Sequence, residues 1–564
     1  MSDIRRSILW VIFGFSLVLL WDQWQIHNGR QATFFPTQPP AAAQAPAQPG
    51  AGNAGVPAAS AALAHAAPGT APGAVAPSSI PRQQHVVSTD VLKLTFDSEG
   101  GSLVGADMPQ HRAVTGQPSQ TQPLTLLTQS PTHTYVAQTG LVGGALPTHK
   151  TPMQLVQGGQ SLADGQDETR LRFESEPVNG VVLAKTYTLA RGSYRLGVQH
   201  EVINRSAAAI TPQLYLQLVR DGSKADSDTP FYSTFTGPAV YSEAAKYEKV
   251  EFEDIDKQKA EFQKTASDGY VAMVQHYFAT AWWLDGGAAR ENFVRKLDQN
   301  LYSAGLLTTL PSIAPGQSHT SSAHLFVGPQ AEKVLEQLTP GLELVKDYGW
   351  VTILAKPLYW LLEKIQGVVQ NWGWSIVLLV VLLKAAFYWR NASAYRSMAK
   401  MKAVNPRVME LRERLKSNPQ QMQMEMMKLY REEKVNPVGG CLPIMVQIPV
   451  FIALYWVLLS SVEMRNAPWA GWITDLSTPD PYFILPLVMT LTTVVQTALN
   501  PLPPDPMQAK LMWIMPLVFS VMFFFFPAGL VLYWITNNVL TIAQQAHINH
   551  RMGVPLKINL PKFN

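Results

Sequence analysis

The sequence has 564 residues, a formal net charge of +4 and a mean hydropathy of +0.01, and these averages conceal a division between unlike parts. A polar region, about residues 88–328, is combined with strongly apolar segments at residues 8–20 and after residue 372. The single cysteine, Cys441, excludes an intramolecular disulfide. The polar region must therefore be stabilised by its own core, for which about 240 residues suffice.

Residues 1–25 have the features of an N-terminal transmembrane anchor. Arg5 and Arg6 precede the apolar run, and no small-x-small cleavage site closes it before Trp21. We expect an uncleaved anchor with its N-terminus in the cytoplasm, although a cleaved signal peptide also has a basic start and a short apolar run.

Two contrasting segments follow the anchor. Residues 31–81 contain no Asp, Glu, Lys or Arg and are dominated by Ala, Pro and Gly, so 26–86 is predicted to be a disordered linker. From 87 to 335, short runs with alternating polar and apolar residues are separated by turn residues, as in VLKLTF at 91–96. This period of two predicts antiparallel hairpins, and we expect an all-β sandwich domain exported to the periplasm.

Residues 340–368 mix aromatic and aliphatic residues with lysines, which predicts an amphipathic helix lying in the membrane interface. Five apolar spans follow within a membrane core at 369–549. Together with the anchor they predict six transmembrane α-helices, and the five core spans are at about 372–390, 441–461, 481–499, 511–526 and 530–546. Pro527-Ala528-Gly529 breaks the last apolar run into two arms, which are short enough to suggest local bilayer thinning.

The distribution of basic residues orients these spans. Residues 390–434 contain eleven Lys or Arg, against one, Arg465, in the loop 462–480. Positively charged loops stay in the cytoplasm. We therefore expect the loop 391–437 and the tail 550–564 to be cytoplasmic and the β domain to be periplasmic.

Lys384 is the only charge in the apolar stretch 372–388. A charge within a span is costly, by about 2.5–3.5 kcal/mol on insertion scales, and tends to face water or protein. It either snorkels to the interface or lines a water-accessible groove. Polar residues on other spans favour the groove, although they could equally be interhelical contacts: Gln447, Thr493, Gln496, Tyr533, Asn537 and Thr541.

The cytoplasmic loop 391–437 is predicted to form a helical hairpin. Asn418-Pro419 is a good N-cap followed by proline at the first helical position, and apolar residues repeat at helical spacing on both sides. Its methionines could form an adaptable surface for partners or could simply fill a core. The candidate partner-binding residues are Met398, Met401, Arg407, Met422 and Met426.

The sequence does not contain the catalytic motifs of several common enzyme classes. The sequence has no G-x-x-x-x-G-K-[ST] motif and no G-x-S-x-G motif, and His200-Glu201 begins a zinc-protease pattern that Asn204 fails to complete. We expect no enzyme activity, no cofactor and no metal site.

Six segments of the last third resemble the YidC family of bacterial membrane protein insertases, which is shared with mitochondria and chloroplasts. They are NWGWSIVLLVVLLK (371–384), YRSMAKMKAVNP (395–406), EKVNPVGGCLPIMVQIPVFIALYW (433–456), DPYFILP (480–486), DPMQAKLMWIMP (505–516) and FPAGLVLYWITNN (526–538). The resemblance covers about residues 340–549. It implies an insertase and chaperone that acts alone or with the Sec translocon, through a hydrophilic groove and without nucleotide hydrolysis.

The resemblance also suggests site residues and partners. Lys384 occupies the place of the family's groove charge, which is more commonly arginine, and Tyr533-Trp534 stands where two tyrosines are frequent. The implied partners are nascent membrane proteins, Sec translocon components, the ribosome and membrane lipids, and no DNA. Two other readings remain: a secondary transporter or channel with an intramembrane cationic site, and a carbohydrate enzyme in the β domain.

Overall fold

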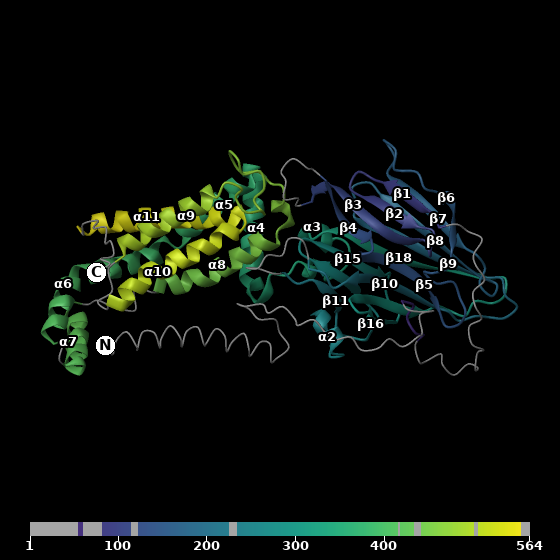
Figure 1. Ribbon diagram of the computed structural model, residues 1–564, viewed down its shortest axis with the longest axis horizontal. Helices are drawn as coiled ribbons and strands as arrows, with labels where there is room; N and C mark the ends of the chain where they lie inside the picture. The colour runs from purple at the N-terminus through teal and green to yellow at the C-terminus, as the bar shows by residue number, and fades with distance from the viewer. Residues whose placement is uncertain are drawn as a thin grey trace. The chain divides into compact units, whose positions relative to one another are not determined.

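The computed structural model describes residues 55–59, 82–113, 122–224, 234–415, 418–433, 442–500 and 506–553. They form two compact units that divide between Lys346 and Asp347: a β domain and a helical unit (Figure 1). The expected anchor at 1–25, most of the linker 26–86 and most of the tail 550–564 lie outside the described residues.

The β domain consists of two nine-stranded antiparallel sheets. The first sheet has, in spatial order, β1 (Gln84–Ser88), β2 (Lys93–Asp97), β3 (Ser102–Arg112), β4 (Pro123–Gln129), β5 (Thr134–Val142), β10 (Gln213–Asp221), β17 (Leu301–Thr309), β16 (Arg290–Asp298) and β13 (Thr265–Ala266). The second has β12 (Lys246–Lys249), β11 (Gly237–Ser242), β14 (Tyr270–Gln275), β15 (Phe278–Leu284), β18 (Ser318–Pro329), β9 (Arg195–Asn204), β8 (Val181–Ala190), β7 (Glu168–Ser175) and β6 (Met153–Gly158). Two short helices, α2 (Phe252–Asp256) and α3 (Glu332–Glu336), and a 3-10 turn, η2 (Leu342–Val345), complete it.

The two sheets pack face to face, as the alternating sequence pattern predicts. Tyr135 of the first sheet lies 2.7 Å from Thr280 of the second through their hydroxyls, and Lys185 of the second sheet donates to carbonyls of the first. Because successive side chains of a strand point to opposite faces, each central strand has one face in this shared core. The all-β sandwich expected for this region is confirmed in its two antiparallel sheets.

Several ionisable side chains of the β domain are buried, among them Lys185, His149 and His200. Lys185 Nζ donates to the carbonyls of Gly100 (2.6 Å) and Thr139 (2.7 Å), and burial lowers its pKa to about 7. Burial also lowers the pKa of His149 and that of His200 to about 3, and the charge of Lys185 adds to both shifts. Both imidazoles are therefore neutral near pH 7.

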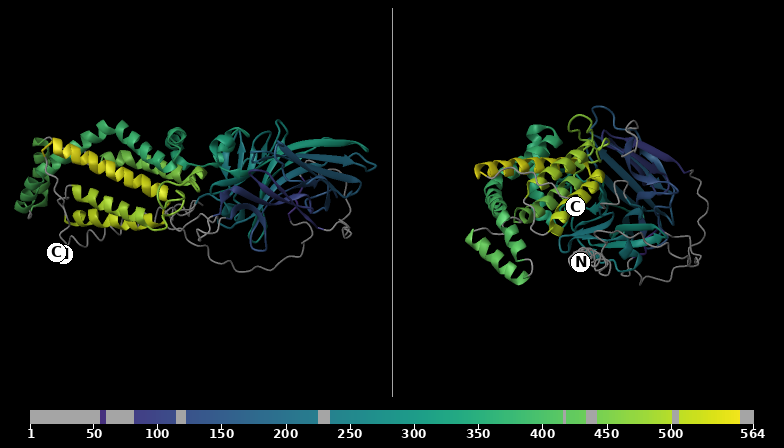
Figure 2. Two further views of the ribbon diagram at one scale, coloured as in Figure 1. Left: turned by 90° about the horizontal axis from the view of Figure 1, so that it is seen from above. Right: turned by 60° about the vertical axis from the view of Figure 1, so that its left-hand side comes forward.

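The helical unit contains eight α-helices among the described residues (Figures 1 and 2). They are α4 (Thr352–Val369), α5 (Trp372–Ala386), α6 (Tyr388–Arg414), α7 (Pro419–Glu432), α8 (Leu442–Ser460), α9 (Ile484–Leu499), α10 (Pro506–Met522) and α11 (Ala528–Arg551), with 3-10 turns η3 (Gly349–Val351), η5 (Val462–Met464) and η6 (Phe523–Phe525). In the described part of the chain, none of the helices combines the length and the hydrophobicity required to cross a membrane.

Several predicted helix boundaries are visible in the helical unit. Helix α7 begins at Pro419, and the side chain of its N-cap, Asn418, accepts from the Gln421 amide. The last apolar run is interrupted as predicted, because α10 and η6 end before Pro527 and α11 begins at Ala528. Within 340–368, where one amphipathic helix is expected, two 3-10 turns precede α4, since Gly341 and Gly349 adopt positive φ angles that stop a continuous helix.

Candidate functional site

The amine of Lys384 lies half-buried between two helices of the helical unit. Its Nζ donates to the hydroxyl of Thr541 on α11 (2.8 Å), and that hydroxyl donates to the Asn537 carbonyl one turn earlier (2.7 Å). Among the described residues no carboxylate forms an ion pair with Lys384. An ammonium group has three donors, so this contact leaves it able to bind a further acceptor.

A second bond extends the polar contacts to a third helix. Gln447 of α8 donates through Nε2 to the Asn537 side-chain oxygen (2.7 Å). Lys384, Gln447, Asn537 and Thr541 thus form one hydrogen-bonded set across α5, α8 and α11, which we call the interior polar set. The fold thus brings Lys384 and Gln447, which the sequence singled out on other spans, to Asn537 and Thr541 of the last helix.

A different face of α11 carries polar residues that the sequence reasoning missed. Asn538 Nδ2 donates to the hydroxyls of Thr493 (3.0 Å) and Thr492 (3.2 Å) on α9. Gln545, seven residues later on the same face, donates to Asn500 Oδ1 (3.3 Å). The spacing of seven was the available signal. Thr493 therefore belongs to the α9–α11 contact and is separate from the bonds of Lys384.

The remaining candidates of the helical unit are placed differently. Tyr533 is buried, and its ring stacks on Phe451 of α8 at 5.9 Å between centroids. Trp534 meets Phe451 edge-on at 4.6 Å and also contacts Phe523. Gln496 is half-buried and joins neither set of hydrogen bonds among the described residues. The two aromatic residues pack the helices together, next to the polar Asn537.

The outward faces of the same helices are apolar. Large hydrophobic side chains are exposed along α5, α9 and α10: Leu378, Val381, Leu382, Leu487, Leu491, Val495, Leu511, Ile514, Leu517, Val518, Phe519 and Val521. Exposed apolar side chains in this number on packed helices are typical of contact with membrane or protein. The helical unit therefore has polar side chains in its interior and apolar side chains on the outward faces of these helices.

Helices α6 and α7 pack on each other and extend beyond the other helices of their unit (Figures 1 and 2). Met426 packs against buried Val404 and Val408, so it fills the core of the hairpin. Met422 is half-buried, whereas Met424 and Met427 are exposed. Arg407 pairs with Glu433 on the surface (2.5 Å). The side chains of Met398 and Met401 lie outside the described residues.

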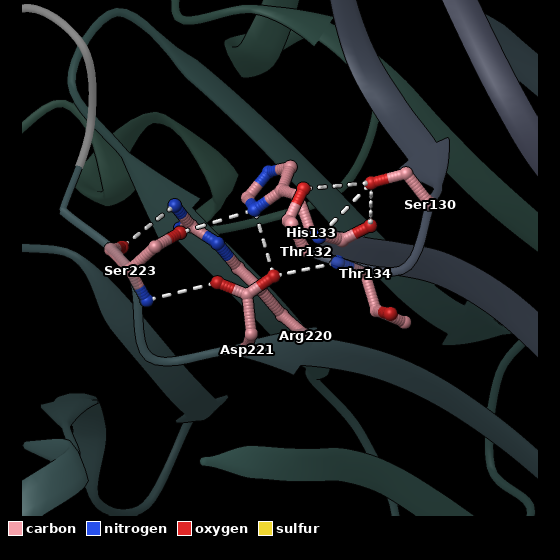
Figure 3. Close-up of polar contacts among 7 residues, drawn as sticks. All are labelled: Ser130, Thr132, His133, Thr134, Arg220, Asp221 and Ser223. Carbon is pink, nitrogen blue, oxygen red and sulfur yellow. Dashed lines mark hydrogen bonds and ion pairs between the residues drawn. The ribbon is translucent and has the colours of Figure 1, made fainter.

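The β domain contains a dense polar cluster at the end of β10, shown in Figure 3. His133 Nδ1 lies 2.7 Å from an Asp221 carboxylate oxygen and 3.1 Å from the Ser223 hydroxyl. Burial favours a raised pKa for Asp221, but hydrogen bonds from Ser223 and from the Thr134 amide, with the nearby His133, hold its pKa below the usual value.

This cluster does not have the geometry of a nucleophile–base–acid relay. Such a relay requires the carboxylate and the hydroxyl on opposite ring nitrogens of the histidine. Here both contact Nδ1 (Figure 3). The cluster instead ties the β4–β5 turn to the end of β10, because the Thr134 amide and the Ser223 amide both donate to Asp221.

Comparison with known proteins identifies two matching families and close relatives. The families described as "YidC periplasmic domain" and "60Kd inner membrane protein" match residues 84–361 and 364–554. The chain is 53% identical to "Membrane protein insertase YidC" of Cupriavidus metallidurans, over 98% of each chain, and 52% identical to that of Ralstonia nicotianae, over 98% of this chain and 99% of the other. A solved structure of an active YidC insertase covers 82% of this chain and 91% of its own, at 17% identity and a TM-score of 0.37.

Proposed function

Because the chain belongs to the YidC family of membrane protein insertases, we propose that it inserts nascent inner-membrane proteins and helps them fold, alone or with the Sec translocon and without nucleotide hydrolysis. The observation that carries this proposal is the Lys384 amine inside the helical unit, hydrogen-bonded to a neutral hydroxyl and beside the Gln447–Asn537 amide pair. These groups offer both donors and acceptors to a polar segment that has left water.

In the proposed mechanism, the interior polar set lines a hydrophilic groove that receives the polar flank of a substrate helix. An acidic flank replaces Thr541 as the acceptor for Lys384, and hydrogen bonds to charged groups contribute about 1.5–3 kcal/mol each. The flank therefore loses less on leaving water than it would in bare lipid. The apolar segment meanwhile passes into lipid and gains about 25 cal/mol per Å² buried, which drives the final step.

The apolar exterior supports placing the helical unit in the inner membrane, with the β domain in the periplasm and both termini in the cytoplasm. Helices α5, α9 and α10 have 15, 16 and 17 residues, so each is only about 23–26 Å long at 1.5 Å per residue. A typical hydrocarbon core is about 30 Å thick, so we propose that the surrounding bilayer is thinned.

The α6–α7 hairpin is proposed to lie in the cytoplasm and to contact nascent chains or the ribosome. The exposed Met424 and Met427 provide an adaptable apolar surface, and the basic residues of α6 suit RNA phosphates or lipid headgroups. Replacing Met424 and Met427 together by serine leaves the Val404–Val408–Met426 core intact, so it tests this surface without unfolding the hairpin.

Photocrosslinking to stalled nascent membrane proteins tests the proposed route. A crosslinking amino acid at Gln447 or Gln496 should capture the polar flank of the substrate, and one at the exposed Val518 should capture lipid or the apolar segment. Capture of the polar flank from Val518 but not from Gln447 would contradict a route through the interior polar set. Flux of a small solute in proteoliposomes, with no crosslink at either interior position, would favour a transporter instead.

A further inference from the structure

One short segment of the linker lies on the β domain. Residues 55–59 have the sequence Gly-Val-Pro-Ala-Ala, and Pro57 is buried while Ala58 and Ala59 are exposed. This segment contacts the outer face of the first sheet, the face turned away from the second sheet. The residues it meets come from four neighbouring strands, β5, β10, β17 and β16.

Two side chains of the sheet donate hydrogen bonds to main-chain carbonyls of the segment. Arg295 donates through Nη2 to the Gly55 carbonyl (2.8 Å) and through Nη1 to the Val56 carbonyl (3.0 Å). Gln217 donates through Nε2 to the same Gly55 carbonyl (2.9 Å). The guanidinium is held in place because its Nε donates to the Ser303 hydroxyl on β17 (3.1 Å). Two consecutive carbonyls are thus recognised by a planar, rigid group.

The side chains of the segment fit the same place. Val56 packs against Val142, Tyr215 and Leu307, which form an apolar cluster on this face of the sheet. Gly55 has a φ of +105°, a backbone conformation that glycine adopts readily and other residues rarely adopt. The site therefore suits a turn with glycine at the first position and a branched apolar residue at the second.

A buried polar atom at this site has no partner among the described residues. Gln217 is fully buried and uses Nε2 to donate to Gly55 and to Gln138 Oε1 (2.9 Å), which fixes the orientation of its amide. Its Oε1 then accepts no hydrogen bond within the described part of the chain. Buried acceptors are normally satisfied, so this oxygen is an unmet hydrogen-bonding group directly at the contact with Gly55.

We propose that the outer face of the first sheet, around Arg295 and Gln217, is a binding site for a short polypeptide segment, and that Gly55-Val56-Pro57 occupies it as a resident ligand. Since Arg295 and Gln217 recognise main-chain carbonyls, the site accepts other chains with a branched apolar residue before proline once the linker segment leaves. This property goes beyond the insertase function and does not depend on it.

The test measures binding of a fluorescent Ala-Gly-Val-Pro-Ala peptide to the full-length protein in detergent, by anisotropy. In the wild type the tethered segment competes at a high effective concentration, which weakens binding. Val56→Lys places a charge in the apolar cluster beside Arg295 and should release the segment, so the peptide should bind at least tenfold more tightly than to wild type. Ala58→Lys adds the same charge at an exposed position and should behave as wild type.

The role of the Arg295 guanidinium is tested in the Val56→Lys variant, in which the linker segment is expected to have left the site. Adding Arg295→Met to Val56→Lys should weaken peptide binding at least tenfold, whereas adding Ser303→Ala, which removes only the Nε contact, should change it less than threefold. An unchanged thermal unfolding profile of each variant shows that the domain is folded. The proposal is overturned if Val56→Lys binds the peptide no better than wild type, or if Arg295→Met has no effect on that binding.

Discussion

Two lysines, one in each unit, are placed in hydrophobic surroundings with different consequences. Lys185 in the β domain is fully buried, and two carbonyls accept from its amine. Lys384 in the helical unit is half-buried and donates to one hydroxyl. The first is enclosed by the fold, which indicates a structural role. The second has one acceptor among the described residues, and it is the one for which we propose a ligand. Depth of burial alone therefore does not identify a functional charge, because the remaining hydrogen-bonding capacity also decides.

The two units also differ in how many large hydrophobic side chains they expose. The β domain exposes few large hydrophobic side chains among its described residues, for example Val86 and Val156, whereas the helical unit exposes them along several helices. Water is the solvent that suits the first surface and lipid the one that suits the second. In the helical unit, polar side chains therefore lie in the interior, and apolar side chains form much of the surface.

The largest effect is expected from reversing the charge of Lys384. Lys384→Glu should abolish insertion of substrates with acidic flanks, because an attraction of about 4 kcal/mol at 4 Å, with an effective dielectric constant near 20, becomes a repulsion. Insertion of substrates with neutral flanks should fall much less. Vesicle insertion assays with the two kinds of flank provide the measurement, and Lys384→Arg is the control that retains the charge. Equal losses for both flanks would indicate that Lys384 is structural.

A charge on the exterior distinguishes the two surfaces. Val518→Arg should destabilise the helical unit by about 2.5–3.5 kcal/mol if that side chain, 61% exposed, faces lipid. The matched change Val156→Arg, at a residue of the β domain that is 50% exposed, should alter stability by less than about 0.5 kcal/mol. Thermal unfolding in bilayer nanodiscs measures both. Similar effects of the two changes would remove the distinction between the surfaces.

The pH dependence of the β domain follows from Lys185. Its pKa is about 7 in the folded state and about 10.5 when unfolded, so between these values the unfolded state binds more protons and stability rises with pH. We expect a gain of about 2 kcal/mol from pH 7 to pH 9. Lys185→Met should flatten this part of the profile of the unfolding signal from the β domain. An unchanged slope in the variant would show that Lys185 is not the group responsible.

Removing one partner of the Gln447–Asn537 bond should cost about 1–2 kcal/mol. Gln447→Leu leaves the side-chain oxygen of buried Asn537 without this donor. A buried acceptor that loses its partner costs more free energy than the loss of both partners together. The double variant Gln447→Leu with Asn537→Leu should recover part of the loss. Unfolding midpoints of the single and double variants measure the coupling, and strict additivity would mean that the two side chains do not interact.

The smallest effect is expected at the contact between α9 and α11. Asn538→Leu removes its bonds to Thr492 and Thr493, and interhelical hydrogen bonds in membranes contribute about 0.6 kcal/mol on average. Insertion of acidic-flank substrates should remain near wild type, since Lys384 and its partner Thr541 are untouched. Activity loss comparable to that of Lys384→Glu would show that the α9–α11 contact belongs to the substrate route.

The sequence by itself determined the elements, because they depend on local patterns. Alternation of period two predicted the strands, Asn418-Pro419 placed the start of α7, and Pro527 divided the last apolar run. The resemblance of residues 371–538 to one family predicted the insertase family, which the comparisons confirm. Lys384 was recognisable because a single charge stands in an apolar stretch.

Only the tertiary structure decided which polar groups meet. Lys384 and Thr541 are 157 positions apart, and Arg295 and Gly55 are 240 apart. Asn537 and Asn538 are adjacent, yet one turns to α8 and the other to α9, because successive residues of a helix point about 100° apart. Such pairings result from how whole elements pack against each other, and local periodicity contains no information about that choice.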